Sequence, residues 1–339
     1  MPAAVRAAVT YEAPPNIALV KYWGVRDPER GLPYNSSFSV TLDRLRSRTT
    51  VRFDPTLDTD RVELNGAPAT GGPRDGVVRF LDRVRARAGL DDRATVRSEN
   101  NFPTASGLAS SASGFAALAG AASRAAGLHL SDRELSQLAR LGSGSACRSI
   151  FGGFVEWHAG TRADGRDCYA RSVYPAGHWP ALVDLVLLVR GAPVKEVRSK
   201  DAMQATVRTS PEYRRRLREV PRRLRGIRAA IGARDAGRLL PLVMEECDSF
   251  RLVCETTTPT LDYLTPTSRW ILEEVRAMNR AAGRAVAGYT HDAGAHVHVF
   301  TLRRDLPSVR RRLAALDGVE RSLVVRPGPG GAERRARAR

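Results

Sequence analysis

The sequence lacks long apolar runs and has few aromatic residues. In its 339 residues there is no stretch of about 18 apolar residues, so an ordinary membrane-spanning helix is not expected. Residues 1–10 also lack the apolar segment of a secretory signal. Because 42% of the residues are hydrophobic, the chain can still bury a substantial core. We expect a cytoplasmic protein of one large or two ordinary domains.

Cysteine is also scarce, with only Cys147, Cys168, Cys247 and Cys254 present. No CxxC spacing occurs among them, so a structural zinc site is not indicated. Cys247 and Cys254 lie seven residues apart in a helical pattern, where they share a face but are too far apart to bridge. The four are therefore predicted to be free thiols, as in a reducing compartment.

Basic residues are abundant, with 54 Lys and Arg against 36 Asp and Glu, and the formal charge is +18. Such a surplus is typical of nucleic-acid binders, but aromatics are only 6% and none interleave with the basic runs at 214–216 and 222–225. Those runs fit the solvated face of a helix. The densest run follows the Pro-Gly breaker at 327–331 and predicts a disordered tail. The positive field suits an anionic small molecule.

The first half mixes short strands with helices. Patterns rich in β-branched residues at 50–53, 62–64 and 94–97 predict strands. A helix of small residues is expected at about 111–126, and Gly127 ends it. Ser131 and Glu134 form a capping-box pattern, which predicts another helix from this point.

The second half is more helical. The run LVDLVLLV at 182–189 predicts a strand covered on both faces. Helical patterns at about 211–230, 237–254 and 266–282 precede strands at 296–302 and 321–325. We expect domains at 1–191 and 192–326, with a basic tail at 327–339.

The segment with the most specific chemistry is PTASGLASSASG at 103–114. It is a loop rich in Gly and Ser that leads directly into a helix, so its backbone amides can face a phosphate at the positive helix end. Hydroxyls of Ser110, Ser111 or Ser113 can add donors or a magnesium ligand. Neither GxxxxGK[ST] nor GxGxxG is present.

PTASGLASSASG resembles the phosphate loop of GHMP kinases, namely Pro, three residues, Gly-Leu, one residue and Ser-Ser. Two further segments, NIALVKYWGVRD at 16–27 and GSGSACRSIFGG at 142–153, are similar to signature segments of mevalonate diphosphate decarboxylases. YTHDAG at 289–294 is similar to the segment that holds the catalytic aspartate of that family. The four segments follow the family's order over nearly the whole chain.

The resemblance implies an α+β, two-domain GHMP-kinase fold, with an N-terminal domain like ribosomal protein S5 and a C-terminal ferredoxin-like α/β sandwich. It also implies ATP-dependent phosphorylation of a tertiary 3-hydroxyl of mevalonate 5-diphosphate, followed by loss of phosphate and carbon dioxide to give isopentenyl diphosphate for isoprenoid synthesis. ATP and Mg²⁺ are the implied cofactors. A phosphorylated mevalonate is the implied partner, without nucleic acid or membrane, and a homodimer is expected.

The resemblance assigns roles to particular residues. Asp292 matches the base or acceptor for the hydroxyl, Lys21 the cation beside it, and Arg148 the residue that grips the substrate. The matched substrate-binding positions are Tyr22, Ser143, Ser145, Arg148 and Lys200, and the ATP-binding positions are Ser98, Asn100, Gly107, Leu108, Ser110, Ser111 and Ser113.

No metal beyond the magnesium carried with ATP is expected. His291, His296 and His298 form the one histidine group, and they lack a carboxylate or cysteine partner at ligand spacing. Ser110 or Ser111 is the candidate magnesium ligand.

Three positions depart from the family pattern, all on the side expected to hold the substrate phosphates. Val25 replaces a usual lysine, Lys200 aligns loosely with an arginine, and Ala295-His296 replaces Pro-Asn. The segment at 26–37 is also similar to phosphomevalonate decarboxylases, which act on the monophosphate. That substrate, a plain small-molecule kinase and a basic nucleic-acid binder remain as alternatives.

Overall fold

The computed structural model describes residues 6–102, 110–192 and 197–334. Five strands of the first half of the chain and one strand from its C-terminal end form a six-stranded sheet in the order β16-β1-β6-β9-β7-β8. The central strands pair antiparallel, whereas β7 runs parallel to β9. The strands predicted at 50–53, 62–64 and 94–97 are confirmed as β6, β7 and β9, and each is longer than the predicted range. The bounds are β1 Val9–Ala13, β6 Ser47–Asp54, β7 Arg61–Leu64, β8 Ala67–Pro68, β9 Arg93–Asn100 and β16 Ala332–Arg334.

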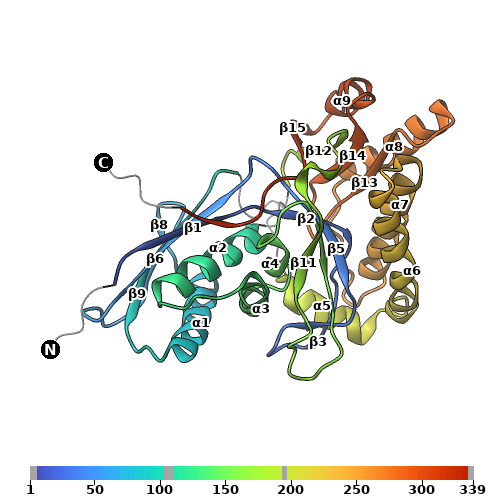
Figure 1. The fold of residues 1–339 in the computed structure, drawn as a ribbon. Coiled ribbons are helices and arrows are strands. Elements are labelled where there is room, and N and C mark those ends of the chain that lie inside the picture. The colour runs from blue at the N-terminus through green and yellow to red at the C-terminus, as the bar shows by residue number, and fades with distance from the viewer. Residues whose placement is uncertain (1–5, 103–109, 193–196, 335–339) are drawn as a thin grey trace.

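Four helices pack with this sheet: α1 (Gly71–Ala88), α2 (Ser110–Ala125), α3 (Asp132–Gly142) and the short α4 (Ala146–Ser149). α2 lies against the sheet through its small residues (Figure 1). A Cβ at Gly120 would lie 2.3 Å from the Tyr11 ring, so only glycine permits this approach. The predicted capping box at Ser131 and Glu134 is present at the start of α3.

A second sheet has the order β11-β10-β5-β2, and β2 carries the start of the family-like segment at 16–27. The edge strand β2 (Asn16–Val20) and its neighbour β5 (Ser37–Thr41) are buried along their whole length. Ile17 and Phe38 share one core cluster with Val220 and Leu239 of later helices, which ties the two halves of the chain together. The remaining bounds are β10 Phe154–Trp157, β11 Ala170–Tyr174, and a separate ribbon of β3 Val25–Asp27 with β4 Leu32–Pro33.

The third sheet has the order β13-β14-β12-β15. β12 (Leu182–Val189) is buried at every position, as predicted: Leu182 and Val186 face one core cluster, whereas Leu185 and Leu187 face another. Because β12 pairs with β14 and β15, it belongs to the C-terminal domain. The domain boundary predicted near residue 192 is therefore wrong and lies before β12. The other strands are β13 Ala287–Thr290, β14 Val297–Leu302 and β15 Val319–Val325.

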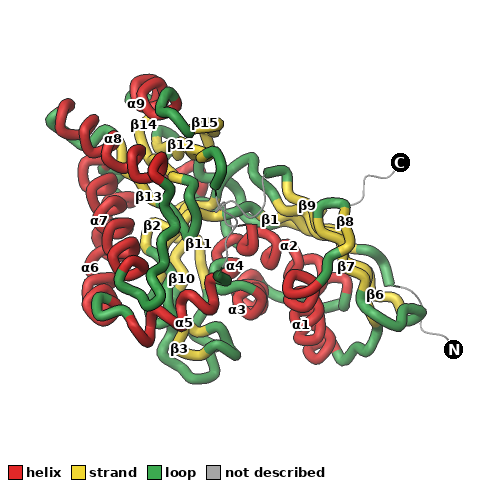
Figure 2. Tube along the Cα trace, turned by 180° about the vertical axis from the view of Figure 1, so that it is seen from behind, coloured by secondary structure: helices red, strands yellow, loops and turns green. Residues whose placement is uncertain are grey.

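Helices α6, α7 and α8 stand together at the side of the molecule that is far from β6 and β9, as seen from both sides in Figures 1 and 2. Their bounds agree with the predicted helical patterns. The helices of this half are α5 Ser199–Thr209, α6 Tyr213–Gly232, α7 Ala236–Glu255, α8 Pro266–Ala282 and α9 Leu306–Ala314, with a 3₁₀ turn at Ala176–His178. Within the described ranges, no helix combines the length and apolar character that crossing a membrane demands.

The segment after Val325 returns to the N-terminal domain. Pro327 forms a β-bridge with Leu42, and β16 adds to the edge of β1. Arg334 Nε also donates to Glu12 Oε2 at 2.8 Å. The predicted disordered tail at 327–339 is therefore wrong as far as Arg334. A three-residue strand after a Pro-Gly segment gives too weak a pattern to be recognised in the sequence.

Candidate functional site

Lys21 and Asp292 form an ion pair between the two domains. Lys21 follows β2, and Asp292 follows β13 in the C-terminal sheet. Lys21 Nζ donates to Asp292 Oδ1 at 2.7 Å, and the lysine side chain is only 3% exposed. The Asp292 side chain is 27% exposed, so it can meet a ligand while it stays paired.

Several charges act on the Asp292 carboxyl group. Burial alone would raise its pKa, but the charge and hydrogen bond of Lys21 outweigh burial and hold the pKa below the ordinary value. His298 and Arg148 add smaller effects in the same direction. Asp292 is therefore ionised at neutral pH, as a proton acceptor has to be.

Arg148 is buried beside this pair, and two of its nitrogens are held by polar side chains. Nε donates to Asn16 Oδ1 at 3.0 Å and Nη1 to Ser37 Oγ at 2.7 Å. Asn16 in turn donates to the Ser145 carbonyl at 3.2 Å and to Ser149 Oγ at 2.8 Å. The orientation of the guanidinium is therefore fixed before any ligand binds.

Tyr22 lies against the loop that carries Ser143 and Ser145. A Cβ at Gly144 would lie 2.6 Å from the tyrosine ring, so the lack of a side chain allows this contact. The ring also meets Trp157 edge-on, with centroids 4.7 Å apart. Burial raises the pKa of the Tyr22 hydroxyl, which remains a neutral donor.

The predicted nucleotide residues lie at the end of β9 and the start of α2. Ser98 shares a hydrogen bond of 2.8 Å with Thr49, and Asn100 accepts a hydrogen bond from Ser47. Ser110 and Ser111 form the first turn of α2, in which no acidic side chain offsets the positive helix end.

The other predicted ATP-binding positions are Ser113, Gly107 and Leu108. Ser113 is fully buried, and its hydroxyl oxygen lies 2.7 Å from the Ser47 hydroxyl and 3.3 Å from the Ser110 carbonyl. This hydroxyl serves the contact of α2 with β6 and is not available to a phosphate. Gly107 and Leu108 lie outside the described residues.

Lys200 and Arg26 stand apart from this cluster. Lys200 is exposed on the first turn of α5. Arg26 donates to the backbone carbonyls of Pro33 at 3.2 Å and Gly160 at 3.3 Å, so its guanidinium is bound by backbone carbonyls. Val25 packs with the apolar cluster around Trp23. The charge missing at Val25 is therefore not replaced by its neighbour Arg26.

The three histidines around Asp292 each have a separate structural contact. His291 Nδ1 lies 2.7 Å from the Asp292 carbonyl, and His296 Nδ1 accepts from the Val189 amide at 3.1 Å. His298 Nδ1 lies 2.7 Å from Asp184 Oδ2. Within the described ranges, no three His, Cys, Asp or Glu side chains are grouped to hold a metal ion.

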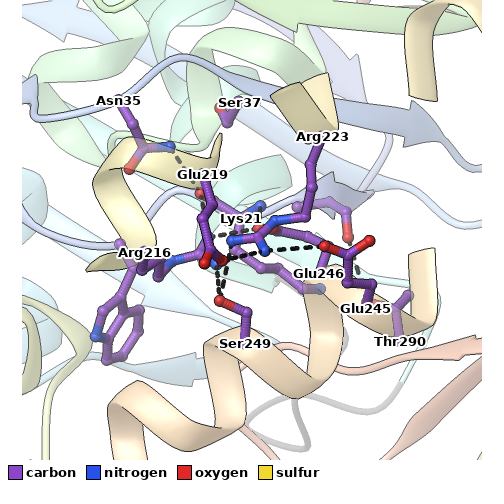
Figure 3. Close-up of polar contacts among 12 residues, drawn as sticks. Lys21, Asn35, Ser37, Arg216, Glu219, Arg223, Glu245, Glu246, Ser249 and Thr290 are labelled. Carbon is purple, nitrogen blue, oxygen red and sulfur yellow. Dashed lines mark hydrogen bonds and ion pairs between the residues drawn. The ribbon is translucent and has the colours of Figure 1, made fainter. Parts of the chain in front are cut away.

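Sequence reasoning missed Asn16, Arg216 and Glu246. Asn16 is a buried polar residue at the start of an apolar strand, which is a signal in itself. Arg216 and Glu246 occupy core-facing positions of α6 and α7 and lie next to Lys21 (Figure 3). The interpretation of the basic runs as a solvated face is wrong for Arg216 and Arg223, which are each 1% exposed.

The two-domain α+β architecture, with a lysine of one domain paired to an aspartate of the other, is that of the GHMP-kinase fold class. The predicted fold class is confirmed by comparison with solved structures. One, described as MDDEF in complex with MVAPP, AMPPCP and magnesium, superposes with a TM-score of 0.91 at 38% identity, covering 98% of this chain and all of the other. The mevalonate diphosphate decarboxylase from Enterococcus faecalis superposes with a TM-score of 0.90 at 37% identity and the same coverage.

Comparison of sequences identifies the family within the GHMP-kinase fold class. A family model for the diphosphomevalonate decarboxylase-like N-terminal domain matches residues 13–170, and one for the mevalonate 5-diphosphate decarboxylase C-terminal domain matches 185–322. Human diphosphomevalonate decarboxylase is 41% identical over an alignment of 356 residues, gaps included. The alignment covers 97% of this chain and 87% of the human protein. The chain belongs to the diphosphomevalonate decarboxylase family.

Proposed function

We propose that this chain is an ATP-dependent diphosphomevalonate decarboxylase that converts mevalonate 5-diphosphate to isopentenyl diphosphate. The observation that carries the proposal is the 2.7 Å pair of Lys21 with Asp292, a carboxylate kept ionised between two domains. The related structure described as a complex with MVAPP, AMPPCP and magnesium supports the same ligands here. The reaction supplies a precursor for isoprenoid synthesis.

The first step is phosphorylation of the 3-hydroxyl. Asp292 accepts the hydroxyl proton, or orients it, as the oxygen attacks the γ-phosphorus and ADP leaves. Lys21 lies at the same carboxylate, where its charge offsets the negative charge that spreads over the transferred group. The carboxylate therefore acts on the hydroxyl that accepts the phosphoryl group, and the ammonium next to it acts on the phosphoryl group of ATP.

The second step is elimination. The C3–O bond to phosphate breaks, and the electron pair of the bond to the carboxylate forms the alkene as carbon dioxide leaves. The products are therefore ADP, phosphate, carbon dioxide and isopentenyl diphosphate. Arg148, held by Asn16 and Ser37, can orient the substrate carboxylate with a forked contact. Tyr22 and the hydroxyls of Ser143 and Ser145 are proposed to bind the diphosphate.

The residues at the start of α2 fit ATP. The first turn of this 16-residue helix offers backbone amides at the positive helix end and the hydroxyls of Ser110 and Ser111, and it has no acidic side chain that would repel phosphate. Ser98 and Asn100 at the end of β9 are proposed to contact the nucleotide. Magnesium carried with ATP would neutralise the phosphate charge, with Ser110 or Ser111 as the proposed ligand.

The 5-diphosphate is favoured over the 5-monophosphate. The loss of lysine at Val25 removes one charged contact, worth about 1.5 to 3 kcal/mol. Nevertheless, the relatives found by comparison are named for the diphosphate, at identities such as 41% for the human enzyme. A cytoplasmic location and a homodimer are part of the proposal, and sedimentation of the purified protein tests the dimer.

The experiment that tests the function supplies the purified protein with Mg-ATP and either mevalonate 5-diphosphate or mevalonate 5-phosphate. The proposal expects equal amounts of ADP, phosphate and carbon dioxide, with the higher kcat/KM for the diphosphate. ADP without carbon dioxide would instead identify a plain kinase. A higher kcat/KM for the monophosphate would identify a phosphomevalonate decarboxylase.

A further inference from the structure

The backbone of Lys21 is held by three side chains that come from outside its own strand. Its amide donates to Glu246 Oε1 at 2.9 Å. Its carbonyl accepts from Asn35 Nδ2 at 3.0 Å and from Arg216 Nη2 at 3.4 Å (Figure 3). These contacts hold both backbone polar groups of the residue whose side chain reaches Asp292.

The local course of the chain explains why side chains are needed here. The pairing of β2 with β5 shifts register between Ala18 and Val20, and β2 then ends at Val20. Lys21 is buried but lies beyond the end of β2, where its amide and carbonyl have no strand partner in the part of the chain that the structure describes. Because buried backbone polar groups need hydrogen bonds, other side chains have to supply them.

Glu246 is itself fixed in place by two buried arginines. Its side chain is fully buried and forms ion pairs with Arg216 and with Arg223, the latter over 2.7 Å between Nε and Oε2. Arg223 extends to Glu219 at 2.7 Å and to Ser249 at 3.0 Å. The carboxylate therefore cannot move away from the Lys21 amide without breaking contacts across α6 and α7.

Stability alone does not account for this cluster. Arg216 shares its face of α6 with Val220 and Ile227, and Glu246 shares its face of α7 with Val243 and Phe250. Replacing a buried ion cluster by apolar residues of similar volume is often neutral or stabilising, because three charges must be desolvated. An apolar residue at position 246 could not, however, accept the hydrogen bond of the Lys21 amide.

We propose that Glu246 is a positioning residue for Lys21, with Arg216 and Asn35 as its partners at the Lys21 carbonyl. The helix pair α6–α7 thereby sets the place of a lysine that belongs to the other domain, and keeps Nζ within reach of Asp292 and the transferred phosphoryl group. The kinetic consequences rest on the proposed function, whereas the structural ones do not.

The test compares two substitutions at one position. Glu246→Met removes the acceptor and the charge, and it should lower kcat by roughly 10- to 100-fold while KM for ATP changes less than about 2-fold. Glu246→Gln keeps an oxygen that can accept the Lys21 amide, and it should restore kcat to within about 5-fold of the wild type. Equal losses in both variants would show that only the charge matters and would overturn the proposal.

Glu245→Gln is the matched control. Glu245 is the preceding residue of α7 and contacts Arg222 and Arg223, but it does not contact Lys21 within the described residues. Its substitution removes one charge from the same cluster and should leave kcat unchanged. A kcat loss equal to that of Glu246→Met would assign the effect to the ion cluster as a whole, against the proposal.

A second route covers the outcome that Glu246→Met does not fold. Asn35→Ala removes a donor to the Lys21 carbonyl without touching the ion cluster, and it should lower kcat about 10-fold with KM for ATP unchanged. Full kcat in Asn35→Ala would contradict the proposal. Crystal structures without substrate give a result that is independent of activity. The distance from Lys21 Nζ to Asp292 Oδ1 should lengthen beyond about 3.2 Å in Glu246→Met or, if that variant does not fold, in Asn35→Ala. If the wild type releases no carbon dioxide, the proposed function fails but this separation still decides the positioning role.

Discussion

Lys21 and Asp292 are 271 positions apart in the sequence, yet their side chains meet at 2.7 Å. The pair explains the charge state of the carboxylate. Burial raises the pKa of Asp292, and the neighbouring cation reverses that effect. The folded pKa is thus below the unfolded value of about 3.9, so the stabilisation by the pair is present above about pH 3.9 and is lost as the pH falls through the folded pKa.

Lys21→Met should reverse the direction of this shift. Burial would then act on Asp292 with less opposing charge, and its pKa should rise relative to the wild type. Carboxyl ¹³C NMR of the two proteins measures the titration directly. An unchanged titration would mean that Lys21 does not control the ionisation of Asp292.

Arg148→Lys should impair substrate use although the charge is kept. Lysine cannot hold Asn16 and Ser37 and present a planar fork at the same time. We expect a rise of roughly 10- to 100-fold in KM for mevalonate 5-diphosphate, with a lower kcat. Steady-state kinetics with thermal unfolding checks this. A variant with altered melting temperature but normal kinetics would make Arg148 purely structural.

Gly144→Ala should act on the substrate through Tyr22. The added methyl group would lie 2.6 Å from the ring, so the ring has to move away from the loop that carries Ser143 and Ser145. KM for the mevalonate compound should increase by about 10-fold, the worth of one charged hydrogen bond. Gly177→Ala is the control, because nothing lies within 4 Å of its added carbon. Equal kinetics in the two variants would remove Tyr22 from the substrate site.

The buried histidines predict how stability depends on pH. Burial, with the charge of Lys21, lowers the pKa of His291 to about 4, whereas an unfolded histidine titrates near pH 6.5. The unfolded chain therefore binds more protons between these values, and the free energy of unfolding should fall as the pH drops from about 6.5 to about 4.

His291→Phe should make this dependence shallower by up to one proton, or about 1.4 kcal/mol per pH unit. Phenylalanine suits the site because the His291 ring already packs against Phe250, with centroids 5.7 Å apart. Urea unfolding at a series of pH values supplies the slopes. If the slope stays the same, His291 is not the group that titrates.

Regular hydrophobic patterns made much of the fold predictable. The apolar run of β12 and the helical periods of α6, α7 and α8 are strong local signals, and all four elements are present. α1 was missed because it begins Gly71-Gly72-Pro73, which suggests a loop. The position of β12 in the C-terminal sheet depends on long-range pairing with β14 and β15, which no local pattern records.

In the candidate site too, some residues could be predicted from the sequence and others could not. Segments with family resemblance led to Lys21 and Asp292, whereas the supports of Lys21 could not be found in that way. Arg216 and Glu246 are charged residues at core positions of two helices, and a charge in a helical pattern ordinarily indicates a solvated face. Only the folded structure, in which Arg216 of α6 forms an ion pair with Glu246 of α7, shows that each of these charges has a partner.

The central claim is that Asp292 acts on the hydroxyl that is phosphorylated before carbon dioxide is lost. The most direct measurement is turnover of mevalonate 5-diphosphate by Asp292→Asn, with ADP, phosphate and carbon dioxide counted and ATP binding measured in parallel. Asparagine keeps the shape of the side chain but cannot take the proton, so all three products should form at least about 10²-fold more slowly while ATP binding is unchanged. Turnover near that of the wild type would contradict the account.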